Sequence, residues 1–201
     1  MEIRDRLPVH ELPEDAREVA GRPLRIDGLV ARPLALDESD LASFRRAEHT
    51  EAFTCEEGWS VPGLRWRGIK LWEIVAGAQP LPSARYVRVC AGDYAVPVSL
   101  KDANRALLCD GLDGQPLTLA HGAPWRLVLP GRECFTSVKW VDRLEVTADP
   151  GPNDGERIAR ARLRSGPPLR TSVRAGHRDR HGRRDTVAAC RCGGLGRLAG
   201  N

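Results

Sequence analysis

Between residues 22 and 148 the chain is a succession of short apolar stretches closed by turn signals, and this pattern constrains the fold most. The stretch RPLRIDGLVARPLAL alternates apolar and polar residues around Asp27-Gly28, a pair typical of hairpin turns. ARYVRVCAGDYAVPVSL likewise predicts two strands around Gly92-Asp93. Further strands are expected at residues 125–129 and within TSVKWVDRLEVTA. The chain should therefore be rich in short strands.

Short helices are expected between these strands. Asp37 or Ser39 can cap a helix in DESDLASF, and GIKLWEIVAGA carries apolar residues at helical spacing up to Gly77. Ser99 and Asp102 predict a capping box for a helix in LKDANRALL. The regular strand–helix alternation of a doubly wound sheet is missing, so we predict an α+β fold, mixed and mostly β, with long loops. The tryptophans assigned to its core are Trp66, Trp72, Trp125 and Trp140.

The charge distribution divides the chain. Residues 156–201 hold twelve arginines, no lysine and three acidic residues, a net charge of +9, which leaves −5 for the rest. We predict an N-terminal extension (1–20), one folded domain (21–150) and an Arg/Gly/Pro-rich tail (151–201) that is disordered. A basic arm that binds nucleic acid is the alternative for the tail. A solvated tail is favoured, because the tail has neither lysines nor aromatic residues for stacking on bases.

Several classes of protein are excluded or disfavoured by what the sequence lacks. No apolar run approaches the roughly 20 residues of a membrane-spanning helix, and the N-terminus has no apolar core of an export signal, so we expect a cytoplasmic protein. A Walker loop, GxGxxG and HExxH are missing. The six cysteines include no CxxC pair, so they are expected to be free thiols rather than a four-cysteine zinc site.

Two groups of residues are candidates for a site. Cys55, in EAFTCEEGWSV, lies where an apolar run gives way to a turn, which suits either a metal-binding thiolate or a small buried side chain. Glu56 and Glu57 beside it are interpreted as turn residues rather than acid–base groups. The second group suits a phosphate-bearing ligand or, alternatively, a solvated charge cluster. Its members are His121, Arg126, Ser137 and Lys139.

Two longer stretches carry a resemblance to a known family. FTCEEGWSVPGLRWRGIKLWEIV and DGQPLTLAHGAPWRLVLPGRECFTSVKWVDRLEV together resemble the molybdopterin-binding domain of the sulfite oxidase family. The resemblance begins near LRIDGLVARPLAL and ends at about Ala148. The residues around Cys55 are most similar to the bacterial branch that includes the methionine-sulfoxide reductase catalytic subunit.

The resemblance implies a function and a site. It implies a Mo-molybdopterin-dependent oxidoreductase that transfers an oxygen atom to or from a small, unidentified substrate. Cys55 would ligate the molybdenum as the catalytic residue. The pterin would be bound by His121, Arg126, Ser137, Val138 and Lys139. No haem-binding segment accompanies the domain, so a separate electron-transfer partner is expected.

Departures from the family pattern leave alternatives open. Ser60 stands where sulfite oxidases carry an anion-binding arginine, so sulfite is a poor candidate substrate. The short N-terminus, and Ala91 in place of a polar pterin contact, favour a second possibility. In that case the chain is a non-catalytic or incomplete molybdopterin-binding protein. A nucleic-acid-binding protein that acts through the basic tail ranks third.

Overall fold

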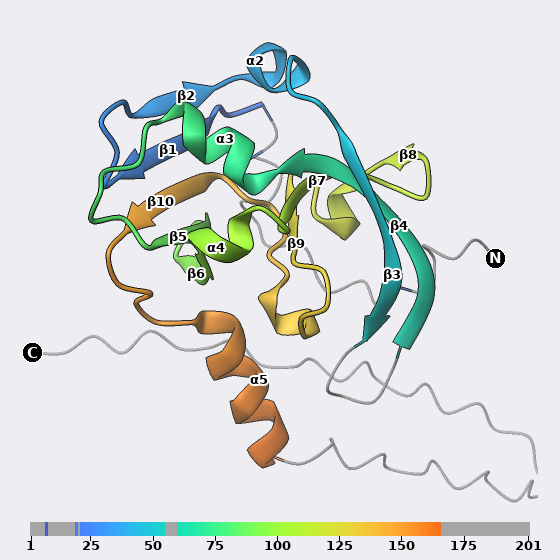
Figure 1. The fold of residues 1–201 in the computed structure, drawn as a ribbon. Helices are drawn as coiled ribbons and strands as arrows, with labels where there is room; N and C mark the ends of the chain where they lie inside the picture. The colour runs from blue at the N-terminus through green and yellow to red at the C-terminus, as the bar shows by residue number, and fades with distance from the viewer. Residues whose placement is uncertain (1–6, 8–18, 20, 55–59, 166–201) are drawn as a thin grey trace, which may run out of the picture. The chain divides into compact units, whose positions relative to one another are not determined.

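The computed structural model describes residues 7, 19, 21–54 and 60–165, and within them the strands form two sheets (Figure 1). The first sheet has the order β2-β1-β10-β5-β6. Strands β1 and β10 are parallel, and the other neighbours are antiparallel. The strands are β1 (Leu24–Gly28), β2 (Leu34–Leu36), β5 (Tyr86–Ala91), β6 (Tyr94–Ser99) and β10 (Arg143–Thr147).

The second sheet is antiparallel and contains a long hairpin. Its order is β3-β4-β7-β8, with β9 paired to β7. The hairpin of β3 and β4 curves along one side of the domain in Figure 1. Strand β4 pairs with β7 only from Trp66 to Lys70, so residues 60–65 of β4 pair with β3 alone. The strands are β3 (Ala47–Thr54), β4 (Ser60–Lys70), β7 (Leu107–Leu112), β8 (Gln115–Pro116) and β9 (Arg126–Val128).

Short helices join the strands. In α2 the Asp37 carboxylate accepts from the Asp40 amide and the Asp40 carboxylate from the Asp37 amide, a complete capping box. Ser99 caps α4 by accepting from the Asp102 amide over 3.0 Å. The α-helices are α2 (Glu38–Ala42), α3 (Leu71–Gly77), α4 (Leu100–Ala103) and α5 (Asp154–Ser165). The 3-10 helices are η2 (Leu119–His121) and η3 (Cys134–Thr136).

Two clusters of buried side chains form the core. The larger joins the inner face of the first sheet to α3 and includes Ile26, Ile74, Val87, Leu127 and Leu144. The smaller lies against the β3–β4 hairpin and includes Phe53, Leu64, Trp66, Leu112 and Val128. Because β9 supplies Leu127 to the first cluster and Val128 to the second, this short strand stands between the two cores.

An α+β, mostly β fold is confirmed, but some local predictions were wrong. The helix expected in LKDANRALL ends at Ala103, because Leu107 already pairs with Lys70 and Val128 in the sheet. The single strand expected in TSVKWVDRLEVTA is interrupted: Trp140 has a φ of 57°, and β10 begins only at Arg143. Of the four tryptophans expected in the core, Trp66 is fully buried. The half-buried ones are Trp72, Trp125 and Trp140.

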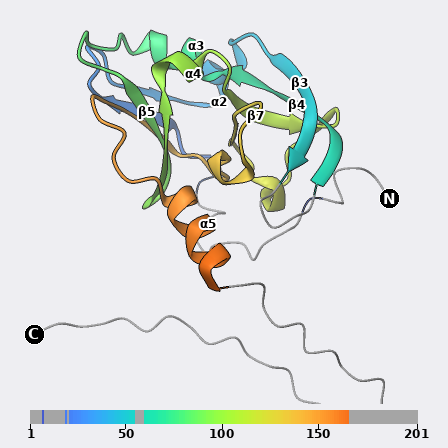
Figure 2. The same ribbon diagram turned by 60° about the horizontal axis from the view of Figure 1, so that its bottom comes forward.

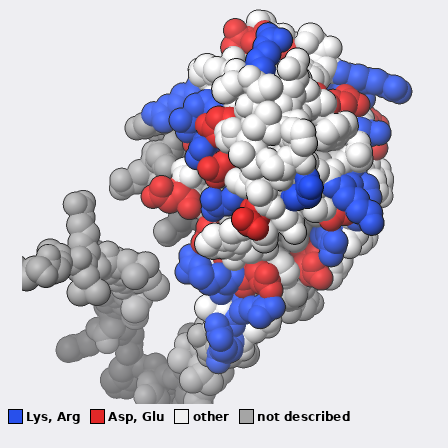
Figure 3. Space-filling view, turned by 60° about the vertical axis from the view of Figure 1, so that its left-hand side comes forward, with Lys and Arg blue, Asp and Glu red and all other residues white. Residues whose placement is uncertain are grey.

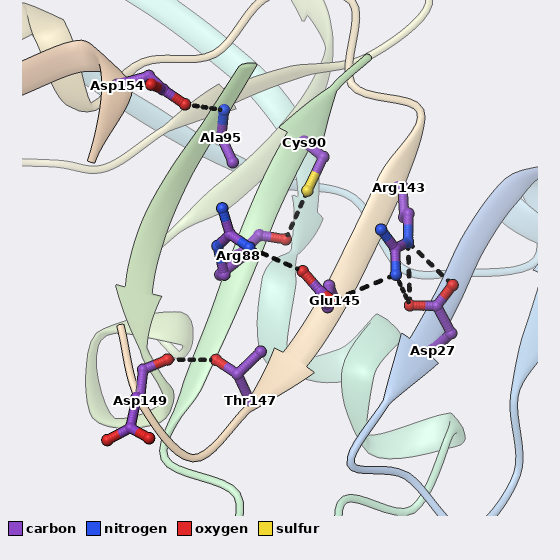
Figure 4. Close-up of polar contacts among 9 residues, drawn as sticks. All are labelled: Asp27, Arg88, Cys90, Ala95, Arg143, Glu145, Thr147, Asp149 and Asp154. Carbon is purple, nitrogen blue, oxygen red and sulfur yellow. Dashed lines mark hydrogen bonds and ion pairs between the residues drawn. The ribbon is translucent and has the colours of Figure 1, made fainter. Parts of the chain in front are cut away.

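The outer face of the first sheet carries a network of ion pairs (Figure 4). Arg143 on β10 donates to both carboxylate oxygens of Asp27 on β1, at 2.8–3.0 Å. It also reaches Glu145, which in turn binds Arg88 on β5 over 3.1 Å. These pairs cross the parallel β1–β10 contact and the antiparallel β10–β5 contact, so they reinforce the register of three strands. Each half-exposed pair adds about 0–1 kcal/mol.

Helix α5 occupies the first part of the segment expected to be disordered. Figure 2 shows it leading away from the strands. Its first turn is attached to the domain: Asp154 accepts from the Ala95 amide over 3.0 Å, a contact drawn in Figure 4, and Gly155 lies against the Phe135 carbonyl. The rest of the predicted tail, residues 166–201, lies outside the described residues. None of the helices in the described ranges is long and apolar enough to cross a membrane.

Candidate functional site

The structure brings the residues of the second candidate group together around β9. Arg126 begins this strand, and the Leu127 amide donates to the Val138 carbonyl over 2.8 Å, which places residues 137–139 alongside it. His121 ends η2, five residues before Arg126. Residues that are separate in the sequence therefore converge because an isolated β-bridge joins Leu127 to Val138. The converging residues are His121, Arg126, Ser137, Val138 and Lys139.

Arg126 is the centre of this group and is almost completely buried, with 5% of its surface exposed. Its Nε donates to Ser137 Oγ over 3.0 Å, and its Nη1 donates to the His121 carbonyl over 3.1 Å. The guanidinium carbon lies 5.2 Å from the ring centroid of Phe53 and 4.9 Å from that of Trp66. These two rings come from β3 and β4, so the arginine joins the hairpin to β9.

The charge of Arg126 has no carboxylate partner among the described residues. Burial lowers its pKa to about 10, so the side chain is still a cation at neutral pH. The ionisable groups that act on it are the thiols of Cys109 and Cys134. Cys109 is itself fully buried, and burial raises the pKa of its thiol, so it is neutral and supplies no counter-charge. A buried cation without an anion is costly, so the surroundings of Arg126 suit a ligand that brings negative charge.

Lys139 adds a second cation beside the first. Its Nζ donates to the Ala120 carbonyl over 2.8 Å and lies 5.5 Å from the ring centroid of Trp140. Burial, and then the nearby charge of Arg126, lower the pKa of Lys139 to about 8. Gly122, at a φ of 108°, allows the close approach: a Cβ there would lie 3.0 Å from the Lys139 Cβ. The two cations therefore concentrate positive potential in one place.

The remaining residues of the group have scaffold contacts. Ser137 Oγ also donates to the Leu127 carbonyl over 2.8 Å, which orients the hydroxyl that accepts from Arg126. The Val138 side chain is buried in the larger core cluster, so it positions the segment by packing. His121 is 8% exposed, and its carbonyl is an acceptor for Arg126. The sequence did not predict that Phe53 and Trp66 contact Arg126. Alternation of apolar and polar residues predicts that a ring is buried, but not which side chain it contacts.

Cys55, Glu56, Glu57 and Trp59 lie outside the described residues. The strands that flank them are described: β3 ends at Thr54, β4 begins at Ser60, and their hydroxyl oxygens are 3.0 Å apart. Among the described residues there is no cluster of three or more His, Cys, Asp or Glu that could hold a metal ion. Cys90 and Cys109 are free thiols, as predicted.

Comparisons with known proteins identify the family of the domain. The sequence model of the oxidoreductase molybdopterin-binding domain matches residues 12–154. An uncharacterized oxidoreductase of Bacillus subtilis, YuiH, is 32% identical over 137 residues, which cover 67% of this chain and 69% of that protein. A nitrate reductase [NADPH] of Fusarium oxysporum is 27% identical over 157 residues. The match covers 64% of this chain but only 17% of the nitrate reductase, so the chain corresponds to one part of that protein.

Solved structures show the same fold. The sulfane dehydrogenase SoxCD of Paracoccus pantotrophus matches with a TM-score of 0.61 and 24% identity, over 70% of this chain and 40% of that chain. The match to the family covers the region from the first strand to the start of α5. The resemblance seen in the sequence is thereby confirmed, as is the sulfite-oxidase-type fold. The chain belongs to the sulfite oxidase family of molybdopterin-binding oxidoreductase domains.

Proposed function

We propose that this oxidoreductase domain binds Mo-molybdopterin and transfers an oxygen atom to or from a small substrate. The observation that carries the proposal is Arg126, a buried cation that no described carboxylate neutralises. A cofactor that ends in a phosphate supplies the missing anion. The family to which the chain belongs binds a pterin of this kind.

Arg126 and Lys139 hold the phosphate in this proposal. Among the described residues the Nε and Nη1 of Arg126 donate to Ser137 and His121, and the other N–H groups of the planar guanidinium would donate to phosphate oxygens. Lys139 contributes a point charge, and its protonated form is the one that attracts the anion. Residues 137–139 close over the pterin because the bridge to Leu127 fixes their position.

Cys55 is proposed as the molybdenum ligand. A thiolate is a soft, strongly donating ligand that suits molybdenum, and the resemblance of FTCEEGWSV to the family assigns this role to the cysteine. The strands on either side of it in the sequence, β3 and β4, carry Phe53 and Trp66, whose rings lie against Arg126 of the proposed phosphate site. When bound, the cofactor supplies the redox chemistry, while the chain's own residues bind and orient it.

The substrate is proposed to be a small molecule other than sulfite. Ser60, at the position of the anion-binding arginine of sulfite oxidases, is a neutral hydroxyl engaged with Thr54 across the hairpin. We also infer a separate electron-transfer partner, because transfer of an oxygen atom to the substrate leaves two electrons to be removed, and transfer from it requires two to be supplied. The described residues contain no cluster that could hold a second metal centre for these electrons. A non-catalytic pterin-binding protein remains the second candidate, favoured by the half-buried Ala91, which offers no polar side chain at the end of β5.

The nucleic-acid hypothesis concerns the basic tail, of which residues 166–201 lie outside the described residues. On the face of the molecule in Figure 3, positive and negative side chains of the described residues are interspersed.

Pterin content tests the proposal. The chain is expressed in a host that makes the cofactor, and bound pterin is quantified after oxidation to its fluorescent form. Arg126→Met should lose most of the pterin. Arg88→Met removes only the ion pair with Glu145 on the first sheet, so this control should retain the pterin. Equal pterin content in wild type and Arg126→Met would remove Arg126 from the binding site.

A further inference from the structure

The outer half of the β3–β4 hairpin has little support from the sheet. Residues 60–65 of β4 pair with β3 alone, and an isolated two-stranded ribbon is only marginally stable in water. The Arg65 amide donates to the Asp113 carboxylate over 2.9 Å, which secures the hairpin where it leaves the sheet. Beyond that point the described part of the ribbon ends at Thr54 and Ser60, and contacts with other parts of the chain supply its further support.

Glu51 makes such a contact. Its Oε2 accepts a 3.0 Å hydrogen bond from the amide of Gly131, which is 80 residues away in the sequence. Glu51 pairs with Leu64, the next pair of the hairpin after Thr50 and Arg65 in the direction away from β7. The Glu51 side chain is 21% exposed. His49 Nε2 lies 3.3 Å from the same carboxylate oxygen. The carboxylate therefore holds a main-chain donor of a different loop.

The loop that Glu51 contacts precedes the proposed pterin-binding segment, residues 137–139. Gly131 precedes η3, and residues 137–139 follow that helix. On the opposite side the loop is attached to the α4 region, because Arg105 donates to the Pro130 carbonyl over 2.9 Å and Arg132 lies 3.5 Å from Asp102. The loop is therefore attached both to the α4 region and to the β3–β4 hairpin, and Glu51 makes the contact with the hairpin.

We propose that Glu51 is a positioning residue that holds the β3–β4 hairpin, and with it the Phe53 ring that faces Arg126, against the pterin-binding segment 137–139. The inference rests on the proposed function, since Arg126 and residues 137–139 are parts of that site. Glu51 lies two residues before Phe53, and Gly131 lies six residues before Ser137. A hydrogen bond from a main-chain amide to a carboxylate is charge-assisted and directional, so it restricts both distance and orientation.

Hydrogen exchange on the full chain, without cofactor, tests the connection itself. In Glu51→Ala the amides of residues 47–54 and 127–136 should exchange about tenfold faster together, as expected from the loss of one hydrogen bond to a charged group. Glu51→Gln keeps an acceptor oxygen and should stay within about threefold of wild type. Arg105→Gln loosens the same loop from its other side, so it should accelerate exchange in residues 127–136 only. Glu48→Ala, on the exposed row of β3, should change neither segment.

Molybdenum retention tests the consequence. Protein loaded with cofactor is dialysed, and the metal that remains is measured over time. Glu51→Ala should release molybdenum about tenfold faster than wild type, with Glu51→Gln close to wild type. Exchange in Glu51→Ala that rises in one segment alone, or metal release equal to that of wild type, would overturn the proposal. Wild-type protein that never acquires molybdenum would refute the proposed function instead, and the exchange result would still decide whether Glu51 connects the two segments.

Discussion

The guanidinium carbon of Arg126 lies 4.9 Å from the ring centroid of Trp66, so a cation shares its pocket with the largest fully buried side chain of the described residues. The aromatic face compensates part of the charge, and hydrogen bonds to Ser137 and His121 satisfy two donors. In the proposed function the phosphate of the cofactor supplies the missing anion. The first prediction follows from the cost of the uncompensated charge in the free protein.

Arg126→Met should leave the cofactor-free protein as stable as wild type or more stable by about 1–2 kcal/mol. A methionine of similar length fills the space between Phe53 and Trp66 without a buried charge. The free energy of unfolding in urea measures the difference. A loss of more than about 2 kcal/mol would mean that the charge is already compensated in the free protein.

Cofactor affinity should depend on pH through Lys139. Burial lowers the pKa of this amine to about 8 in the free protein, so the cation that attracts phosphate is present below that pH and is lost above it. Affinity should therefore fall as the pH rises from 7 to 9, and Lys139→Met should reduce this dependence. Cofactor release rates across that range provide the measurement.

The stability of the free protein should show the opposite trend. The unfolded lysine, with its ordinary pKa of 10.5, binds more protons than the folded one between pH 8 and 10.5. The contribution of Lys139 to stability therefore rises with pH across this interval. Urea unfolding of wild type and Lys139→Met gives this difference, and curves that stay parallel would show that burial does not perturb the amine.

Gly122→Ala should impair the site by two effects that a control separates. Its φ of 108° is unfavourable for alanine, and the added Cβ would lie 3.0 Å from the side chain of Lys139. Gly63, at a φ of 69°, has open space around the same position, so Gly63→Ala reports backbone strain alone. Both variants should lose about 1–3 kcal/mol of stability, but only Gly122→Ala should also lose pterin. Pterin loss in both variants would contradict a specific role for the Gly122–Lys139 contact.

Gly155→Ala should loosen the attachment of α5. A methyl group at this position would overlap the Phe135 carbonyl oxygen and lie 2.8 Å from the Tyr94 hydroxyl, so the helix must shift away from η3. Trypsin should then cleave at the arginines of α5 about tenfold faster than in wild type. Ala159→Gly, further along the helix, lowers helix propensity without this clash and is the matched control. Because Gly155→Ala by itself raises helix propensity, cleavage of this variant no faster than that of wild type would contradict the clash.

Local sequence signals predicted local structure well. Asp37 caps α2 because a carboxylate and the amides it caps are neighbours in the chain, and Gly92-Asp93 turns β5 into β6 for the same reason. Predictions that needed distant partners were less successful. The helix after Ser99 was expected to include Leu107 and Leu108, but these residues belong to β7 and pair with β4 and β9.

The residue types of the site could be predicted, but its geometry could not. His121, Arg126 and residues 137–139 were grouped on their chemistry, and the structure brings them together through the bridge from Leu127 to Val138. The burial of Arg126 between two rings of the hairpin depends on residues 60 to 73 positions away in the sequence. No short-range pattern encodes such a contact, and the same holds for Glu51 and Gly131.

Molybdenum content is the most direct test of the account. Wild type and Cys55→Ser, expressed in a host that makes the cofactor, are analysed by elemental mass spectrometry and by visible absorption. The account predicts near-stoichiometric molybdenum in wild type with a thiolate-to-metal absorption band that Cys55→Ser lacks. Folded wild-type protein that contains no molybdenum, or an unchanged absorption band in Cys55→Ser, would contradict it.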